Sequence, residues 1–302
     1  MEESKCIICG SPDYKVVFPE NKAQIHRIVK CSKCGLMYAN PQSHAKIEGK
    51  VSLEQLNDPE GKDDDSQTYE QFVLGLHNYI TKQTIQLKDY RKSLNVLKKL
   101  NFSGSLFEIG AFTGNFLKEA ENYGWKVSGI EPMVHAVTYA KKNLGIDLIP
   151  KPFEVADIPA HSYDAVCNFH VIEHVYDPVP FVTKVAHILK KDGVFVTETP
   201  CYDTLIFKIL RHRERSVRCN GHLFFFTKKS LKDLMEKCGF RVIKFERVGR
   251  TLSLARLLIN FDIIIGRKNK PFFSRLNDKF NLEKITFTFN MRDMQRMYCT
   301  PA

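Results

Sequence analysis

The sequence predicts an α/β protein with a mostly parallel sheet, preceded by a small unit built around four cysteines. Between Ser105 and Glu246, short apolar runs alternate with segments of helical periodicity, which is typical of repeated strand–helix units. The first 34 residues contain two pairs of the form Cys-x-x-Cys, a spacing typical of metal ligands. A chain of 302 residues that is 43% hydrophobic can bury a sizeable core, so one large domain with a small appendage is expected.

The N-terminal unit is predicted to span residues 1–42. Cys6, Cys9, Cys31 and Cys34 form CIICG and CSKCG, two thiol pairs that are each followed by glycine. Two such knuckles predict a zinc ribbon, a closed structural Zn(II) site whose four ligands all come from protein. Four unrelated buried thiols are the alternative. The polar residues 43–68 lack apolar periodicity and predict a linker.

Residues 69–302 are predicted to form the large domain. Apolar residues at helical spacing predict one or two helices before residue 100. Strands are predicted at 105–110, 126–131, 146–150, 163–169, 193–199, 241–248 and, as a seventh, 285–290. Gly193 and Gly239 stand where helix C-caps are expected.

A glycine turn follows the first of these strands. In LFEIGAFTGNF, residues 106–116, Gly110 and Gly114 let the backbone approach a ligand closely. A dinucleotide site would have GxGxxG, but Phe112 stands where the middle glycine is expected. Glu131 ends the next predicted strand, where a carboxylate can accept hydrogen bonds from both ribose hydroxyls of an adenosine ligand. A tight turn that binds no ligand is the alternative.

This block resembles the core of class I S-adenosylmethionine-dependent methyltransferases. Residues 161–200, which include FHVIEHVYDP, resemble the fourth-strand and fifth-strand blocks of the same family, and the resemblance covers roughly residues 70–248. It implies a Rossmann-like, mostly parallel sheet of seven strands, S-adenosylmethionine as cofactor and methyl transfer as activity. The residues that it places at the cofactor are Glu108, Gly110, Phe112, Gly114, Glu131, Pro132, Phe153, Glu154, Asn168, Phe169 and His170.

The resemblance also implies what several of these residues do. Glu108 orients the amino-acid end of the cofactor, the glycines pack beneath it, and Glu131 holds the ribose. The adenine lies against the loop 151–157, with Phe153 or Glu154 nearest. Residues 168–170 flank the methionine portion of the cofactor.

Three histidines are candidate catalytic bases. Methyl transfer depends mainly on alignment, but a hydroxyl or carbon nucleophile also needs a base, and a histidine with a pKa near ~6.5 can serve at neutral pH. His170 and His174 would share a face if their loop begins a helix, although His174 as a packed residue behind the site is the alternative. Related sugar C-methyltransferases carry Tyr-x-Glu-His, whereas residues 219–222 here read Cys-Asn-Gly-His, so only His222 is carried over.

Charge and hydropathy indicate which kinds of partner the protein can bind. Residues 201–302 hold 22 Lys and Arg against 9 Asp and Glu, so the net charge of +11 arises in this part of the chain. Such a basic region attracts phosphate, on a small acceptor or on a nucleic acid, although solvated lysines are the alternative. Residues 251–280 predict a helical insertion, whose apolar part, 252–273, packs on the core or contacts a membrane surface peripherally.

The sequence therefore predicts a methyltransferase that acts on a small molecule, at an oxygen of a sugar, a nucleotide-linked sugar or a biosynthetic intermediate. An RNA-modifying methyltransferase and a non-catalytic cofactor-binding or zinc-ribbon interaction protein are the alternatives. No apolar run reaches the ~18 residues of a membrane span, and paired cysteines suit a reducing compartment, so a cytoplasmic location is expected. The sequence leaves the oligomeric state open.

Overall fold

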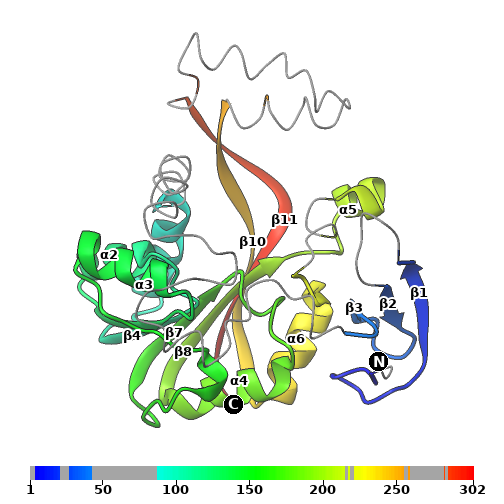
Figure 1. Cartoon of the computed structure of the whole chain (residues 1–302), viewed down its shortest axis with the longest axis horizontal. Coiled ribbons are helices and arrows are strands. Elements are labelled where there is room, and N and C mark those ends of the chain that lie inside the picture. Colours follow the sequence, from blue (N-terminus) through cyan, green and yellow to red (C-terminus); the bar gives the residue numbers. More distant parts are fainter. Residues whose placement is uncertain are drawn as a thin grey trace.

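The computed structural model describes residues 4–20, 27–42, 87–214, 217, 221–254, 258, 282 and 285–302. In this part of the chain the main sheet has seven strands in the order β10-β11-β8-β7-β4-β5-β6 (Figure 1). The strands are β4 (Ser105–Ile109), β5 (Lys126–Ile130), β6 (Leu148–Ile149), β7 (Tyr163–Phe169), β8 (Leu189–Pro200), β10 (Phe240–Ser253) and β11 (Thr286–Pro301). The predicted sheet is confirmed.

The strand directions leave one strand reversed. The pairs from β6 through β5, β4 and β7 to β8 are all parallel. Strand β11 pairs antiparallel with both β8 and β10, so β10 again runs in the direction of the parallel strands. The carboxyl ends of these strands meet at one edge of the sheet, which is where open α/β sheets bind their ligands.

Helices cover both faces of the sheet, because the strands are apolar on both sides. Strand residues Phe107, Val166 and Phe195 share one core with apolar side chains of the helices α4 (Pro178–Ile188) and α6 (Lys228–Lys237). Strand residues Leu106 and Ala165 share the opposite core with α2 (Asn115–Asn122) and the helical residues 87–99. The helix α3 (Val134–Tyr139) follows β5, and the short α5 (Leu205–Leu210) follows β8.

Two sequence-based expectations at the strand ends are wrong, and one is confirmed. Helix α4 ends at Ile188 and β8 begins at the next residue, so Gly193 lies inside a strand and caps no helix. Strand β11 continues to Pro301, far beyond the predicted end at 290, because its polar residues pair on both sides inside the sheet. Gly239 follows α6 with a φ of +80°, as expected for a C-cap glycine.

The N-terminal unit forms a second, smaller sheet. Strands β1 (Tyr14–Phe18), β2 (Ile28–Cys31) and β3 (Met37–Ala39) are antiparallel neighbours. The fourth strand is β9 (Phe224–Phe225), which comes from the large domain and pairs with β3. The two units therefore share a sheet, and their buried side chains form one continuous cluster.

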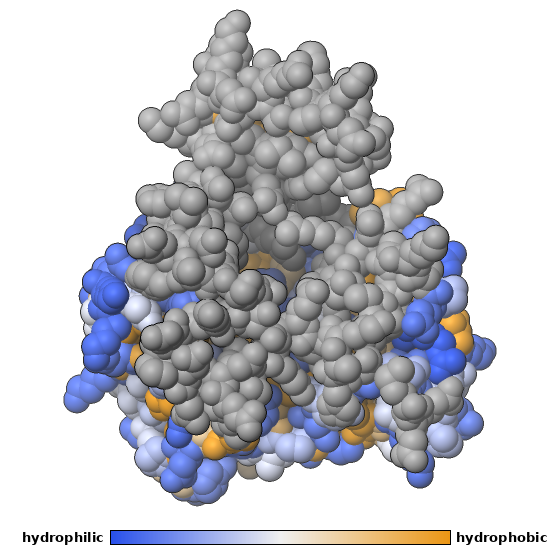
Figure 2. All heavy atoms as spheres, viewed as in Figure 1, coloured by the Kyte–Doolittle hydropathy of each residue, from blue (hydrophilic) through white to orange (hydrophobic). Residues whose placement is uncertain are grey.

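Strands β10 and β11 also form a two-stranded arm that reaches beyond the sheet (Figure 1). The predicted linker and nearly all of the predicted insertion, including 259–273, lie outside the described residues. Among the residues that are described, no helix is long and apolar enough to cross a membrane. Leu205 and Ile209 of α5 are 72% and 70% exposed. An orange patch marks this helix in Figure 2.

Candidate functional site

The glycine turn lies directly at the carboxyl end of β4, against the end of β5. The backbone N–H groups of Gly110 and Ala111 both donate to the carbonyl oxygen of Ile130, at 2.9 and 3.1 Å. Gly110 has a φ of +72°, and a Cβ there would lie 2.6 Å from Cγ2 of Val171. Gly114 has a φ of +75° and begins α2. Both positions therefore require glycine for backbone conformation, and Gly110 also for space.

The carboxylate of Glu131 closes this turn. Its Oε2 accepts a hydrogen bond from the backbone N–H of Phe112 at 2.8 Å, and its Oε1 accepts one from Met133 at 3.0 Å. Glu131 is 8% exposed, and Pro132 lies half-buried in the turn between Glu131 and Met133. A carboxylate offers about four acceptor positions, which suits a group that also binds the hydroxyls of a ribose. The glycine turn and the acid thus form one cradle.

Two buried polar groups near the same edge have unused hydrogen-bonding atoms. Glu108 in β4 is 3% exposed, and its Oε2 has no hydrogen-bond partner among the described residues. Burial raises the pKa of Glu108 well above its usual range, and the nearby charge of Glu131 adds to the shift. Asn168 in β7 is fully buried, and neither atom of its amide is partnered within the described part of the chain. Orphaned groups of this kind fit a polar ligand that the protein binds here.

The remaining residues that the sequence placed at the cofactor differ in accessibility. Phe153 is 3% exposed and packs between Phe107 and Phe181 in the core. Glu154 is exposed, so of the two alternatives for the adenine it is the one whose side chain can reach a ligand. Phe169 packs against Phe116, with ring centroids 4.7 Å apart, so its ring belongs largely to the core.

The loop 151–157 also exposes Val155, which the sequence did not single out. Its side chain is 56% exposed in the loop that was expected to receive the adenine. An exposed β-branched residue in a ligand-binding loop offers an apolar surface for a flat base. In the sequence, Val155 is one of several small apolar residues, and only the structure shows that it points outward.

The three candidate histidines surround one buried carboxylate, Glu173. His170 Nδ1 lies 3.5 Å from Glu173 Oε1, and His170 Nε2 lies 3.6 Å from Glu198 Oε1. Ligand atoms of Glu173, His174 and His222 all lie within 4.8 Å of one another. Burial opposes ionisation of Glu173, but the close approach of His170 and the positive charge that the neighbouring imidazoles can carry lower its pKa to about 2.

The loop that carries these residues is a turn. His174 N–H donates to the carbonyl oxygen of Val171, and residues 171–175 form no helix, so the condition under which His170 and His174 would share a helical face is not met. Both nevertheless lie close to Glu173. Because Val171 fills the space beside Gly110, the histidine turn packs directly on the glycine turn. The two halves of the candidate site are therefore adjacent.

The tautomer of His174 follows from its contact with Gly221. His174 Nδ1 lies 2.8 Å from the carbonyl oxygen of Gly221, which can only accept a hydrogen bond. Nδ1 therefore carries the proton, and the neutral ring keeps its lone pair on Nε2. The ring of His222 stands edge-on to this ring, with centroids 4.6 Å apart, and its Nδ1 lies 3.3 Å from the hydroxyl of Tyr202.

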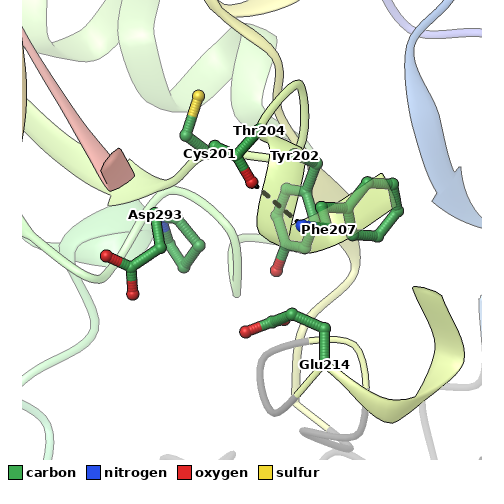
Figure 3. A pocket seen from close by; sticks show the side chains of 7 residues that line it. Cys201, Tyr202, Thr204, Phe207, Glu214 and Asp293 are labelled. Atoms are coloured by element: carbon green, nitrogen blue, oxygen red, sulfur yellow. Dashed lines mark hydrogen bonds between the residues drawn. The ribbon is translucent and has the colours of Figure 1, made fainter. Parts of the chain in front are cut away.

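A pocket opens on the other side of Tyr202. Figure 3 shows the carboxylates of Glu214 and Asp293 and the hydroxyl of Tyr202 around a common space, with the ring of Phe207 beside it. The pocket is lined by Pro200, Cys201, Tyr202, Thr204, Phe207, Glu214 and Asp293. The hydrogen bond between Tyr202 and His222 connects this pocket to the histidine cluster.

The four N-terminal cysteines also meet in one place. The Sγ atoms of Cys6 and Cys34 lie 3.3 Å apart, those of Cys9 and Cys31 lie 3.5 Å apart, and all four are within 4.8 Å of one another. A tetrahedral Zn(II) site with Zn–S bonds of about 2.3 Å separates its sulfurs by about 3.8 Å, so this cluster fits such an ion. None of the four is in a disulfide.

The sheet, with its reversed strand β11 between β8 and β10 and an acid-closed glycine turn after β4, is that of a ligand-binding α/β protein of the Rossmann-like class. The family model described as "Methyltransferase domain" matches residues 82–244, more than half of the chain. The chain therefore belongs to this family, and its fold is that of class I S-adenosylmethionine-dependent methyltransferases. S-adenosylmethionine is the cofactor that the family implies, and the residues at the sheet edge fit it.

Curated relatives match only part of their own length. The ubiquinone biosynthesis O-methyltransferase of Bradyrhizobium diazoefficiens is 30% identical over 116 residues, which are 36% of this chain and 46% of the relative. The enzyme of the same name from Cereibacter sphaeroides is 27% identical over 128 residues, 40% of this chain and 50% of that protein. The chain thus spans about half of the length of these relatives.

Among solved structures, an S-adenosylmethionine-dependent methyltransferase of Thermotoga maritima has a TM-score of 0.50 and 20% identity. The match covers 78% of this chain and 98% of that one. A chain from the complex of the Haloferax volcanii Trm112 methyltransferase activator has a TM-score of 0.52 and 11% identity, and the match covers 77% and 97% of the two chains. At these identities the likeness establishes the fold alone.

Proposed function

We propose that this protein transfers the methyl group of S-adenosylmethionine to an oxygen atom of a small acceptor, with the histidine cluster as the base. The single observation that carries the proposal is the cluster of Glu173, His174 and His222, in which Glu173 and His174 lie on the turn that packs against the glycine turn. Relatives named as O-methyltransferases support oxygen as the acceptor atom.

Each part of the site then has a role. Glu131 holds the ribose and Glu108 faces the amino-acid end of the cofactor, which supplies an activated methyl group when it is bound. His174 accepts the proton of the acceptor hydroxyl at Nε2, because its Nδ1–H is committed to Gly221. Glu173 stabilises the imidazolium that results, since its carboxylate is buried next to the ring.

The small pocket beside the cluster can receive a single hydroxyl group of an acceptor. Glu214 and Asp293 accept hydrogen bonds, Tyr202 can both donate and accept, and Phe207 offers an apolar ring. The two carboxylates at this place oppose the approach of a polyanion such as RNA. A phosphate of a nucleotide-linked sugar would have to lie away from these two side chains.

We also propose that Cys6, Cys9, Cys31 and Cys34 hold a structural Zn(II) ion, because their geometry fits a tetrahedral site with four thiolate ligands. Metal analysis of protein purified under reducing conditions tests this assignment. One zinc per chain is expected, and zinc-free protein with intact thiols would reject it.

The experiment that tests the activity is a screen with radiolabelled S-adenosylmethionine over cell metabolites and RNA fractions. Transfer to a small hydroxylated metabolite that is lost in His174→Gln, with cofactor affinity retained, would support the proposal. General-base catalysis contributes about 10²- to 10⁴-fold, so a loss of that size is expected. Transfer to RNA with a steep salt dependence would reject it in favour of the alternative.

A further inference from the structure

We infer that the four-cysteine unit positions the histidine cluster of the large domain. The contact runs through the segment of residues 221–226, which contributes Gly221 and His222 to the cluster and strand β9 to the small sheet. The inference rests on the proposed function for its catalytic meaning, but its structural content does not depend on any activity.

The segment is held between the N-terminal unit and the histidine turn. On one side, β3 pairs with β9 through Met37 opposite Phe225 and Tyr38 opposite Phe224. The backbone N–H of Ala39 adds a bond of 2.8 Å to the carbonyl oxygen of Leu223. Within the described residues β3 is the neighbouring strand of β9, which is otherwise an edge.

On the other side, the segment binds the backbone of Glu173. The N–H groups of Leu223 and Phe224 donate to the carbonyl oxygen of Glu173, at 2.8 and 3.2 Å. His174, the next residue, binds Gly221. A displacement of the segment would therefore move His222 and release the contact that fixes the tautomer of His174.

The cysteine knuckles determine where β3 lies. Cys34 is three residues before Met37, and the N–H of Cys31 donates to the carbonyl oxygen of Leu36 at 2.8 Å. Leu36 is fully buried, in the same cluster as Leu223. A metal ion that fixes Cys31 and Cys34 thus fixes the start of the strand that pairs with β9.

Helix α6 holds the other knuckle against the large domain. Lys237 Nζ donates to the carbonyl oxygens of Ile7 and Ile8, at 2.8 and 2.9 Å, between the first two cysteines. Both knuckles are therefore tied to elements of the large domain. By contrast, the cofactor cradle is built from β4, β5 and their turns, and none of the contacts described for it involves the N-terminal unit.

Two readouts on the 302-residue chain separate positioning from general stability. Hydrogen exchange of residues 221–226 reports on the segment, and calorimetry with S-adenosylhomocysteine reports on the cofactor cradle. Cys31→Ser, and chelation of zinc from wild-type protein, should each raise exchange of 221–226 at least about tenfold, equivalent to about 1.4 kcal/mol of lost local protection. Exchange of 105–109 and the affinity for S-adenosylhomocysteine should stay within about twofold of wild type.

Three further variants, one of them a control, keep all four cysteines. Lys237→Ala should raise exchange of 221–226 with zinc retained, whereas Lys232→Ala on the same helix, which loses an exposed pair with Glu236, should not. Gly221→Ala should shift the side-chain nuclear magnetic resonance signals of His174, because its Cβ would lie 2.9 Å from His174 Nδ1.

Three outcomes would overturn the inference. The first is unchanged exchange of 221–226 in zinc-free protein whose β1–β3 amides exchange faster. The second is loss of S-adenosylhomocysteine binding together with loss of exchange protection at 221–226. The four-cysteine unit would then stabilise the whole domain instead of one segment. The third is purified protein without zinc. None of these readouts involves the acceptor. The result of the activity screen therefore does not decide this inference, which is tested by exchange, calorimetry and metal analysis.

Discussion

Replacement of Glu131 by alanine should abolish most of the affinity for the cofactor. The carboxylate accepts backbone hydrogen bonds from Phe112 and Met133 and, in the proposed complex, one from each ribose hydroxyl. A hydrogen bond to a charged group contributes about 1.5–3 kcal/mol, so loss of the two ribose bonds weakens binding by about 3–6 kcal/mol. That corresponds to a dissociation constant roughly 10²- to 10⁴-fold higher.

The conservative variant Glu131→Gln refines this expectation. Its amide oxygen can still accept a bond from one backbone N–H and one ribose hydroxyl, so a loss of about half that free energy is expected, roughly 10- to 150-fold in affinity. The matched control is Glu121→Gln in α2, because Glu121 pairs with Lys118 at the surface.

Calorimetric titration with S-adenosylhomocysteine measures all three variants, and thermal unfolding checks that each remains folded. If folded Glu131→Ala binds S-adenosylhomocysteine within about twofold of wild type, the carboxylate does not hold the ribose and the assignment of the cradle is wrong.

Three other perturbations follow from the geometry. Gly110→Ala should lower the free energy of unfolding by at least about 1–2 kcal/mol and weaken cofactor binding, because φ is positive and the new Cβ would meet Val171. Urea unfolding measures the first effect and calorimetry the second. The pKa of Glu173 is lowered to about 2, so the associated stability, about 3 kcal/mol, is complete above about pH 5 and is lost as the pH falls toward 2. Unfolding between pH 2 and 6 should show this slope in wild type and not in Glu173→Gln, and identical profiles would contradict the assignment. Arg296→Leu should cost about 3–5 kcal/mol, since it leaves Glu198 buried without its 2.8 Å partner; the double variant with Glu198→Leu should recover part of the loss in urea unfolding.

The sequence determined the fold and the position of the cofactor turn, because both depend on local patterns. Strand–helix periodicity between Ser105 and Glu246 yields the parallel strands, and Gly110 with Gly114 marks a turn that few other residues could form. The two Cys-x-x-Cys pairs are also local patterns, so the sequence alone predicts that the four cysteines share a metal ion. The structure brings their sulfurs together, as that spacing predicts.

Tertiary structure decided everything that depends on residues far apart in the chain. Strand β11 extends to Pro301 because β8 and β10 pair with it on both sides, and no apolar alternation near Arg296 indicates a strand. His222 joins His174 because the segment 221–226 is held between Glu173 and β3. Strand β3 lies far from this segment in the sequence, at residues 37–39. Side-chain direction is set by such packing, which is why Phe153 is buried and Val155 is exposed although the two residues are nearly adjacent in one loop.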